Sequence, residues 1–543
     1  MVMLLKNKFG LILFILSSVL FIPFLGGVNL FDWDEVNFAE ISREMIVSGN
    51  YLNMTVNFEP FYEKPPLFFW LQVLSMKIFG INEFAARFPN AITGIITILF
   101  LYFAGRKIKN PKFGFIWAFS MMVAVLPNMY YKSGIIDPLF NLWMFLSVYF
   151  GWMYLHFPHK KVFHAVSAGL FAGLAMLTKG PVGLLLPALS LLIYFLIHIR
   201  KFKINIFEII LSVTTAIAFP LFLYLLVSGF SLSFIVAFVE RNIALFSQPD
   251  AGHGGFLLYH FPAVFAGMLP ASVFAIENLF RKNVSDNNNG FRALMLILLI
   301  VVMLVFTIVK TKIIHYSSLA YFPVSYLAAL CVYNILYHHF KLSALSKILL
   351  LSFSGLFAIA GIAFPLIMNN REILYGLFSD LYSKEAFLAP VDWPLYLGAG
   401  FILFGSLFFI FVIKWFKNLV ISKYLIIATF SFVLMIHYTL HIFLGRVEAH
   451  SQASLVEFCE EYKGENVVFM TMGFKSYIPY FYGNSMPHSD LKGKNKYEIL
   501  TSTHSKTIYV ITKLDKSQEI MNLYTLTELY RKNGYVFLTR TKN

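Results

Sequence analysis

The chain has 543 residues, of which 58% are apolar and only 13% charged, and its mean hydropathy is +0.71. This composition excludes an ordinary soluble domain and predicts a polytopic membrane protein. The formal net charge of +15 is spread between apolar runs instead of forming one basic patch, so we predict no nucleic-acid partner. The two cysteines, Cys331 and Cys459, are too few for a disulfide framework and lack metal-ligand spacing.

About thirteen apolar runs are long enough to cross the roughly 30 Å of hydrocarbon in a bilayer. They cover 9–28, 89–105, 113–130, 135–155, 162–178, 181–198, 206–228, 256–278, 291–309, 316–337, 347–368, 393–413 and 424–444. Lys6 and Lys8 precede the first run, which has no small-residue cleavage site, so we expect an uncleaved span. The predicted fold is therefore mainly α, with each run a transmembrane helix in contact with membrane lipid.

Alternate connections between these runs carry the basic residues. They are RKIKNPK from Arg106, HKK from His159, RKFK from Arg200, and the segments around Arg281, Lys341 and Lys414. Because basic loops stay on the cytoplasmic side, we predict a cytoplasmic N-terminus and an outer C-terminus.

Two long hydrophilic stretches are expected on the outer side. In the first outer loop, 29–88, EVNFAEISREMIVSG has the periodicity of an amphipathic helix closed by Gly49. The region 446–543 alternates strand-like NVVFMTM, TIYVIT and YVFLTR with helix-like ASLVEFCEEY and NLYTLTELYRK, which predicts a small α/β domain. We therefore divide the chain into a membrane domain, 1–445, and an outer domain, 446–543.

Ionisable residues gather at the predicted outer ends of the spans. They are Asp34, Glu35, Glu63, Lys64, Asp137, Lys179, Arg241, His253, Lys312 and His315. We expect them to line one outward-facing cavity. Carboxylates among several cations suit a phosphate-linked substrate, because Lys and Arg hold phosphate while a carboxylate takes up a proton or orients a hydroxyl.

Each of these residues also has a simpler interpretation. Asp34 and Glu35 suit a helix N-terminus, Glu63 and Lys64 a solvated ion pair before a proline turn, and Asp137 a helix start before proline. Lys179 can extend to lipid headgroups, and His253, among glycines, can be a loop residue. The joint occurrence of all of them favours a functional site.

Several motifs carry a family resemblance that runs along essentially the whole chain. They are DEVNFAEISREMIVSGN from Asp34, YEKPPL from Tyr62, EFAARFP from Glu83, Asp137, TKGP from Thr178 and RNIALFSQPDAGHGGFLLYHFP. The sequence resembles the lipid A aminoarabinose transferases and the bacterial relatives of protein O-mannosyltransferases. These are integral membrane glycosyltransferases of the GT-C type that use a polyprenyl-phosphate sugar.

The resemblance implies a GT-C fold in the cell inner membrane. It implies transfer of a sugar from undecaprenyl phosphate to a lipid A-type glycolipid, a glycan or a protein acceptor. The resemblance implies that Asp34 is the essential carboxylate, and we predict Glu35 and Asp137 as further catalytic residues. Lys64 is expected to bind the lipid phosphate, together with Lys179, Arg241, Lys312 and His315. Glu63 and His253 are expected to bind a divalent metal such as Zn²⁺. No nucleotide is expected, since no GxxxxGK[ST] loop occurs.

Asn37 stands where the first motif of the aminoarabinose transferases, D-E-x-R-Y, has Arg, and Gly254 and Gly255 replace basic residues after His253. A different sugar or a hydroxyl acceptor is therefore an alternative. A transporter or lipid flippase is the rival from another class, and it predicts inverted repeats and ionisable residues near the midplane of the bilayer. A receptor whose outer domain binds a partner is a second rival.

Overall fold

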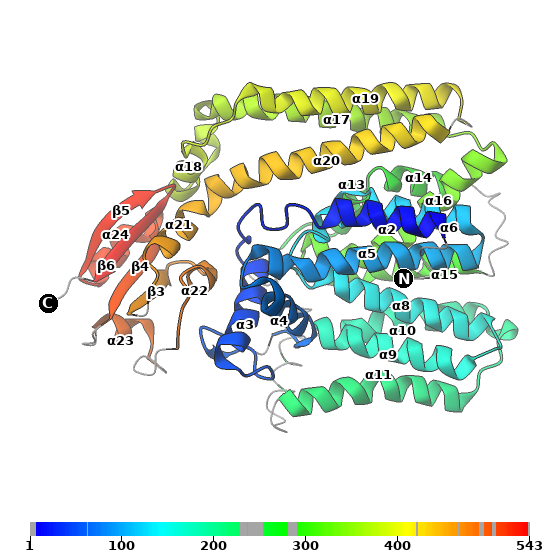
Figure 1. Cartoon of the computed structure of the whole chain (residues 1–543), viewed down its shortest axis with the longest axis horizontal. Helices are drawn as coiled ribbons and strands as arrows, with labels where there is room; N and C mark the ends of the chain where they lie inside the picture. Colours follow the sequence, from blue (N-terminus) through cyan, green and yellow to red (C-terminus); the bar gives the residue numbers. More distant parts are fainter. Residues whose placement is uncertain are drawn as a thin grey trace.

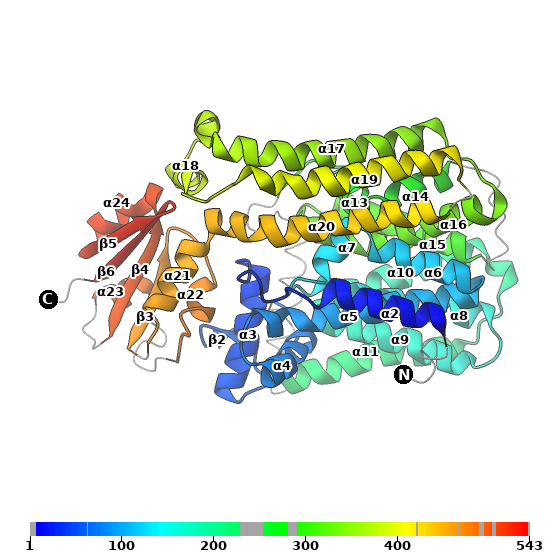
Figure 2. The ribbon, with the colours of Figure 1, turned by 45° about the horizontal axis from the view of Figure 1, so that its top comes forward.

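The computed structural model describes residues 7–61, 63–227, 236, 240, 254–280, 290–419, 422–464, 466–487, 494–501 and 506–540. Long helices form one bundle, and a small C-terminal α/β domain caps one end of it (Figure 1, Figure 2). The fold is mainly α, as predicted.

The elements follow the chain in three groups. The bundle contains α2 (Lys8–Phe21), α5 (Glu83–Ile108), α6 (Pro111–Met122), α7 (Val125–Tyr130), α8 (Asp137–His156), α9 (Lys161–Lys179), α10 (Val182–Ile197), η1 (Ile199–Lys201), α11 (Ile206–Val227), α13 (His260–Gly267), α14 (Ala271–Leu279), α15 (Phe291–Ile308), η2 (Ile314–Ala320), α16 (Tyr321–His338), α17 (Ala344–Asn369), η3 (Arg371–Leu377), α18 (Leu381–Leu388), η4 (Leu395–Leu397), α19 (Gly398–Lys417) and α20 (Ser422–Ser451). The first outer loop contains α3 (Asp34–Ser48), β1 (Thr55–Val56), β2 (Glu59–Pro60) and α4 (Leu67–Phe79). The C-terminal domain contains α21 (Ala453–Glu461), β3 (Val467–Met472), α22 (Ile478–Phe481), α23 (Lys496–Thr501), β4 (Thr507–Lys513), α24 (Leu514–Leu523), β5 (Leu526–Lys532) and β6 (Tyr535–Arg540).

Every predicted apolar run contains a helix or two consecutive helices. By length and composition, eight of the described helices can cross a membrane, or nine when one bent pair counts as a single span. Some apolar helices, such as α2 and α10, are shorter than that. The chain is thus a multi-span membrane protein, and the number thirteen stays a prediction.

Two runs expected to be continuous are broken. The run 256–278 forms α13 and α14, which meet at 118°, and the run 113–130 forms α6 and α7. The two breaks contact each other, since the Val125 N–H donates a 3.2 Å hydrogen bond to the Leu269 carbonyl. A backbone group freed from a helix in a bilayer needs such a partner, so each break satisfies the other.

The basic connections that the structure describes lie at the end of the bundle opposite the C-terminal domain (Figure 1). Helix α5 starts at Glu83, which accepts a 3.0 Å hydrogen bond from Tyr482 of that domain, and it runs for 26 residues to Ile108. Beyond that end, Lys109 Nζ lies 4.6 Å from the centre of the Tyr333 ring. The predicted alternation of basic and other connections therefore separates the two ends of the bundle.

Small and polar residues set how the first helices start and pack. The side chains of Asn82 and Asn110 accept hydrogen bonds from the first turns of α5 and α6, as N-cap residues do. Helices α5 and α6 approach so closely that a Cβ on Gly114 would collide with the Tyr102 carbonyl. Absence of a side chain at Gly114 thus allows the contact.

The first outer loop is tied to the C-terminal domain. Helix α3 ends at Gly49, with φ of 68°, which confirms the predicted glycine stop. The Leu30 N–H donates a 2.7 Å hydrogen bond to the Tyr482 hydroxyl, and Arg43 Nη2 donates one of 2.6 Å to the Ser485 carbonyl. These bonds join segments more than 400 residues apart.

The C-terminal domain has a four-stranded sheet in the order β3-β4-β6-β5, in which β3 and β4 are parallel. The three predicted strands are confirmed as β3, β4 and β6. The prediction of a helix for NLYTLTELYRK is wrong, because 526–532 forms β5 and pairs antiparallel with β6. Asn533 and Gly534, with φ of 51° and 81°, make the tight turn of this hairpin, and that Asn-Gly pair was the missed signal.

A buried carboxyl group in α3 holds the β1–β2 hairpin. Glu44 is fully buried and accepts hydrogen bonds from Thr55 Oγ1 at 2.5 Å and from the Phe58 N–H at 3.0 Å. Burial, and then the carboxylate of Glu40, raise the pKa of Glu44 from 4.5 to about 8. Glu40 itself is paired with Arg43 at 2.7 Å. Glu44 therefore carries a proton at neutral pH.

We predict that Glu44 makes stability depend on pH. The folded chain keeps a proton that the unfolded chain loses, so stability falls as pH rises from 4.5 to about 8, by roughly 5 kcal/mol at most. Glu44→Gln keeps a hydrogen-bond acceptor without this proton, so its melting temperature should fall less between pH 5 and pH 9. Thermal unfolding of the detergent-solubilised chain measures the difference. Glu59→Gln, on the exposed side of the hairpin, is the control, and equal pH slopes for all three proteins would contradict the prediction.

Candidate active site

A cavity of about 800 Å³ lies between the first outer loop, the end of the bundle and the C-terminal domain. We call it the main cavity. Its wall includes six of the residues predicted from the sequence: Asp34, Glu35, Glu63, Lys64, Lys179 and His315. The expectation that these side chains share one cavity is confirmed.

Asp137 organises the charges behind the wall of the main cavity. It is the first residue of α8 and is 2% exposed. Its Oδ1 accepts a 2.6 Å hydrogen bond from Lys179 Nζ, and its Oδ2 lies 3.7 Å from His315 Nε2. Because Asp137 is not among the residues that line the cavity, we interpret it as a positioning residue in place of the predicted catalytic one.

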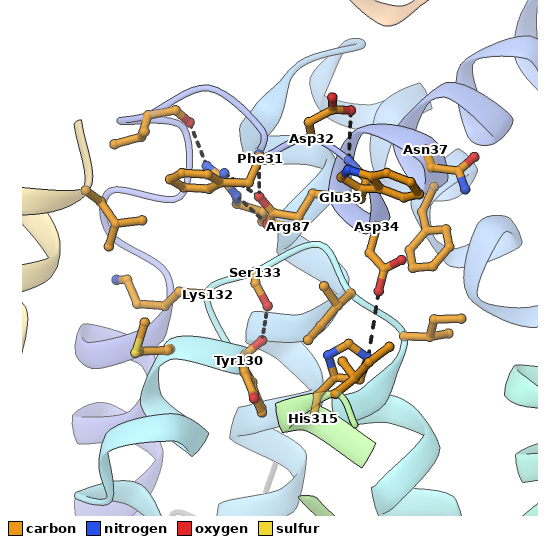
Figure 3. A pocket seen from close by; sticks show the side chains of 18 of the residues that line it. Phe31, Asp32, Asp34, Glu35, Asn37, Arg87, Tyr130, Lys132, Ser133 and His315 are labelled. Atoms are coloured by element: carbon orange, nitrogen blue, oxygen red, sulfur yellow. Dashed lines mark hydrogen bonds and ion pairs between the residues drawn. The ribbon is translucent and has the colours of Figure 1, made fainter. Parts of the chain in front are cut away.

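Asp34 presents its carboxylate to the main cavity. It begins α3, its side chain is 44% exposed, and its Oδ2 lies 3.8 Å from His315 Nε2 (Figure 3). Trp33, directly before it, has φ of 72°, a left-handed conformation that costs a non-glycine residue of order 1 kcal/mol or more. Such strain is typical of functional sites, and the exposed part of the Asp34 carboxylate leaves room for a substrate atom.

Glu35 faces away from Asp34, toward Arg87 (Figure 3). Its carboxylate accepts hydrogen bonds from Arg87 Nη2 at 2.8 Å and Nε at 3.0 Å, from the Gly134 N–H at 2.5 Å and from the Phe31 N–H at 3.0 Å. Burial raises the pKa of Glu35, but Arg87 and these donors outweigh it and hold the pKa below its usual value. With four donors this carboxylate anchors the loop, and we interpret Glu35 as a positioning residue; its predicted catalytic role stays a prediction.

Lys64 and Glu63 lie on the wall as an ion pair, with Lys64 Nζ 2.6 Å from Glu63 Oε1. The charge of Lys64 also acts on Asp137 and His315, so it belongs to the same end of the main cavity. Two prolines follow and lead into α4, as the proline turn predicts. The pair is therefore more than a solvated surface contact.

Lys312 is the described residue of the predicted phosphate-binding set that does not line the main cavity. The ammonium of Lys312 donates hydrogen bonds of 2.8 Å to the carbonyls of Phe306 and Thr307, so it caps the end of α15 in place of the predicted binding of phosphate. Arg241 and His253 lie outside the described residues, and their roles stay predictions.

The predicted metal site cannot be assembled from the described residues. Glu63 is the described member of the pair, and its Oε1 accepts from Lys64. Within the part of the chain that the structure describes, no group of three His, Cys, Asp or Glu could hold an ion. The divalent metal stays a prediction, which elemental analysis of the purified chain tests; metal-free active protein would exclude it.

The wall also contains cations that the sequence analysis missed. Lys132 follows an apolar run and donates to the Leu20 and Pro23 carbonyls at 3.0 and 2.6 Å, and Arg87 lies within the quoted EFAARFP motif. For Lys132 and Arg87 the sequence contains a signal that could have identified them, namely a cation at the outer end of a span. For Lys475 and Tyr477 of the C-terminal domain the sequence contains no such signal, because only the packing of that domain brings them to the cavity.

Comparisons with known proteins agree with this architecture. The family model of dolichyl-phosphate-mannose-protein mannosyltransferases matches residues 63–227. Undecaprenyl phosphate-alpha-4-amino-4-deoxy-L-arabinose arabinosyl transferase 2 of Proteus mirabilis (strain HI4320) is 29% identical over 269 residues, 49% of this chain and 48% of the relative. The transferase of this kind from Wigglesworthia glossinidia brevipalpis is 28% identical over 337 residues, 60% of this chain and 59% of the relative. The chain thus spans about half the length of the relatives it matches.

The similarity in fold is more extensive than the similarity in sequence. The crystal structure of ArnT from Cupriavidus metallidurans bound to undecaprenyl phosphate superposes over 98% of both chains, with a TM-score of 0.77 and 17% identity. The chain therefore has the GT-C fold of this membrane protein, and in sequence it resembles the undecaprenyl phosphate-aminoarabinose arabinosyl transferases.

Proposed function

We propose that the chain is a glycosyltransferase that moves a sugar from a polyprenyl-phosphate donor to an acceptor at the outer face of the cytoplasmic membrane. The observation that carries the proposal is the main cavity, where the exposed Asp34 carboxylate shares a wall with Lys64, Lys179 and His315. Cations at one end suit a phosphate, and a carboxylate beside them suits the acceptor.

The main cavity contains side chains that suit both the phosphate and the isoprene chain of a lipid donor. Lys64 and Lys179 supply N–H donors for the phosphate, while Asp137 holds Lys179 in place at 2.6 Å. Apolar side chains, among them Ile135, Leu440 and Leu444, also line the main cavity and suit the first isoprene units.

The proposed reaction is a displacement at the anomeric carbon. An acceptor oxygen forms the new C–O bond while the bond to the phosphate oxygen breaks, and polyprenyl phosphate leaves with that electron pair. When the acceptor is a hydroxyl, Asp34 takes its proton; when it is an ionised phosphate, Asp34 orients it. Lys64 and Lys179 stabilise the negative charge that develops on the leaving phosphate.

The relatives support this class of donor. Two are named transferases of aminoarabinose on undecaprenyl phosphate, and the similar ArnT structure holds undecaprenyl phosphate. A transporter or flippase would place its ionisable residues near the bilayer midplane. In the described chain, charges of the cavity lie at helix ends, such as Asp34 at the start of α3 and Lys179 at the end of α9, which favours the transferase. The acceptor is a glycolipid, a glycan or a protein.

The first prediction from this proposal concerns Asp34. Asp34→Asn should lower transfer by about 10²- to 10⁴-fold because it removes the proposed base, while insertion and melting temperature stay unchanged. Mass spectrometry of surface glycolipids and glycoproteins, from cells with and without the chain, identifies the product and measures its loss. Asp392→Asn, at an exposed carboxylate of another outer connection, is the control. Normal turnover of well-folded Asp34→Asn protein would reduce Asp34 to a helix-start residue.

The second prediction concerns binding of the lipid phosphate donor. Lys64→Ala should weaken binding of a short-chain polyprenyl phosphate about tenfold or more, because it removes a charge-assisted contact. Binding to the solubilised chain is measured by calorimetry, with Lys77→Ala on the exposed side of α4 as control. Unchanged affinity would mean that Lys64 and Glu63 form an ion pair that does not contact the donor.

The third concerns orientation in the cell inner membrane. The basic connections lie opposite the C-terminal domain, so the N-terminus should be cytoplasmic and the C-terminal domain periplasmic. Reporter fusions at Lys109 and after Arg446 should report opposite sides. Reporters on the same side would contradict the predicted topology and the location of the main cavity at the outer face.

A further inference from the structure

The connection between α17 and α19, residues 370–397, exposes several large apolar side chains. We call it the 370–397 connection, and it contains η3, α18 and η4. Ile373 and Leu377 of η3 are 82% and 77% exposed, and Tyr396 of η4 is 70% exposed. Exposed apolar groups gathered in this way mark an interaction surface.

This connection begins and ends at two helices that can cross a membrane. Helix α17 has 26 residues and, at about 1.5 Å per residue, is longer than the roughly 30 Å of hydrocarbon that a span must cross. Leu366 and Ile367 are exposed in its last turn, and Leu395 is exposed directly before α19. The apolar surface of the 370–397 connection therefore continues the lipid-facing surface of the two spans.

The same connection is bonded to the C-terminal domain. The Asp515 carboxylate accepts hydrogen bonds from the Leu381 and Tyr382 N–H groups at 2.7 and 3.1 Å, and the Tyr382 hydroxyl donates to the Tyr535 hydroxyl at 2.9 Å. A Cβ on Gly534 would lie 2.6 Å from the Tyr382 carbonyl oxygen, so the two backbones are in contact. Helix α18 lies between the ends of α17 and α19 and the C-terminal domain (Figure 1). The connection thus links this domain to the spans.

The charges of the 370–397 connection do not favour an anionic partner. Two cations stand against four carboxylates: Arg371 and Lys384 against Glu372, Asp380, Glu385 and Asp392. Both cations also have contacts within the chain, since Arg371 Nη1 donates a 3.0 Å hydrogen bond to the Met368 carbonyl and Lys384 Nζ lies 4.9 Å from the centre of the Tyr375 ring. Apolar contact, and not charge, must therefore hold the partner.

We infer that the 370–397 connection lies in the headgroup region of the leaflet on the side of the C-terminal domain, and that it anchors this domain to the bilayer surface. Ile373 and Leu377 enter the boundary between headgroups and acyl chains. Tyr375 and Tyr396 lie at the level of the headgroups, where amphipathic rings are favoured. The partner is the phospholipid itself, bound without a requirement for negative charge. The anchor does not depend on the proposed glycosyl transfer.

Single cysteines that carry a fluorescent label test the depth of this segment in phosphatidylcholine nanodiscs with nitroxide lipids. The natural residues Cys331 and Cys459 are buried, so the label reports on the introduced cysteine. A label on Ile373→Cys should be quenched most by a nitroxide near the headgroup, at a depth of about 5–10 Å. A label on Ile359→Cys, exposed within α17, should be quenched most by a nitroxide near the chain end. A label on Tyr497→Cys should be quenched by neither, because α23 lies at the far side of the C-terminal domain from the bundle (Figure 1, Figure 2).

The same label separates the possible occupants of the surface. Absence of quenching at Ile373→Cys by both nitroxides would overturn the inference. If that label is shielded only in nanodiscs that hold two copies of the chain, a second copy covers the surface, and this result would overturn it too. Added phosphatidylglycerol should leave the depth unchanged, and a depth that requires this anionic lipid would refute the apolar mode of binding.

Hydrogen exchange tests the anchoring of the C-terminal domain. The double variant Ile373→Asp/Leu377→Asp should exchange the amides of α18 faster than the parent in nanodiscs, because carboxylates leave the apolar boundary. Tyr497→Asp, at an exposed position of the C-terminal domain, is the control and should exchange α18 like the parent. Parent-like exchange by the double variant would mean that lipid does not hold α18. The depth of the Ile373→Cys label keeps the test independent of how well the double variant folds.

Discussion

The buried ion pair between Glu35 and Arg87 is the contact on which the site depends. Arg87 lies in α5 and also donates to the carbonyls of Leu25 and Val28, at 2.8 and 2.7 Å, so one guanidinium holds both α3 and the segment after α2. Successive residues of a helix point about 100° apart. Once Glu35 is directed at Arg87, its neighbour Asp34 is directed at the main cavity.

The charges around the main cavity position one another more than they stabilise the fold. Taking a carboxylate and an ammonium out of water costs several kcal/mol each, which their attraction roughly repays. The 2.6 Å contact of Asp137 with Lys179 is such a pair. Its consequence is that the ammonium and the His315 ring stay together on the wall of a cavity that apolar side chains also line, as a lipid phosphate requires.

The C-terminal domain completes the site from outside the bundle. Its Tyr477 N–H bonds Asp32 at 3.0 Å, and its Lys475 ammonium lies 5.6 Å from the centre of the Trp33 ring, so the domain contacts the two residues before Asp34. One loop of this domain therefore closes the main cavity. The position of Asp34 thus depends on a contact made by the C-terminal domain.

The sequence by itself determined where the helices are, because a bilayer requires long apolar segments whose backbone bonds internally. It also determined the Gly49 stop, three of the strands and which charges lie at one end of the bundle, since alternate ends of successive spans share a side. Only the tertiary structure distinguished the environment of Lys179 from that of Lys312. Both are lysines at outer ends of apolar runs, but Lys179 meets a carboxylate and Lys312 meets the carbonyls that end a helix. The partner of Lys179 lies 42 residues away in the chain and those of Lys312 only five and six, so position in the sequence alone did not distinguish the two lysines. The difference between Asp34 and Glu35 likewise depends on Arg87, which lies 52 residues from Glu35 in the chain.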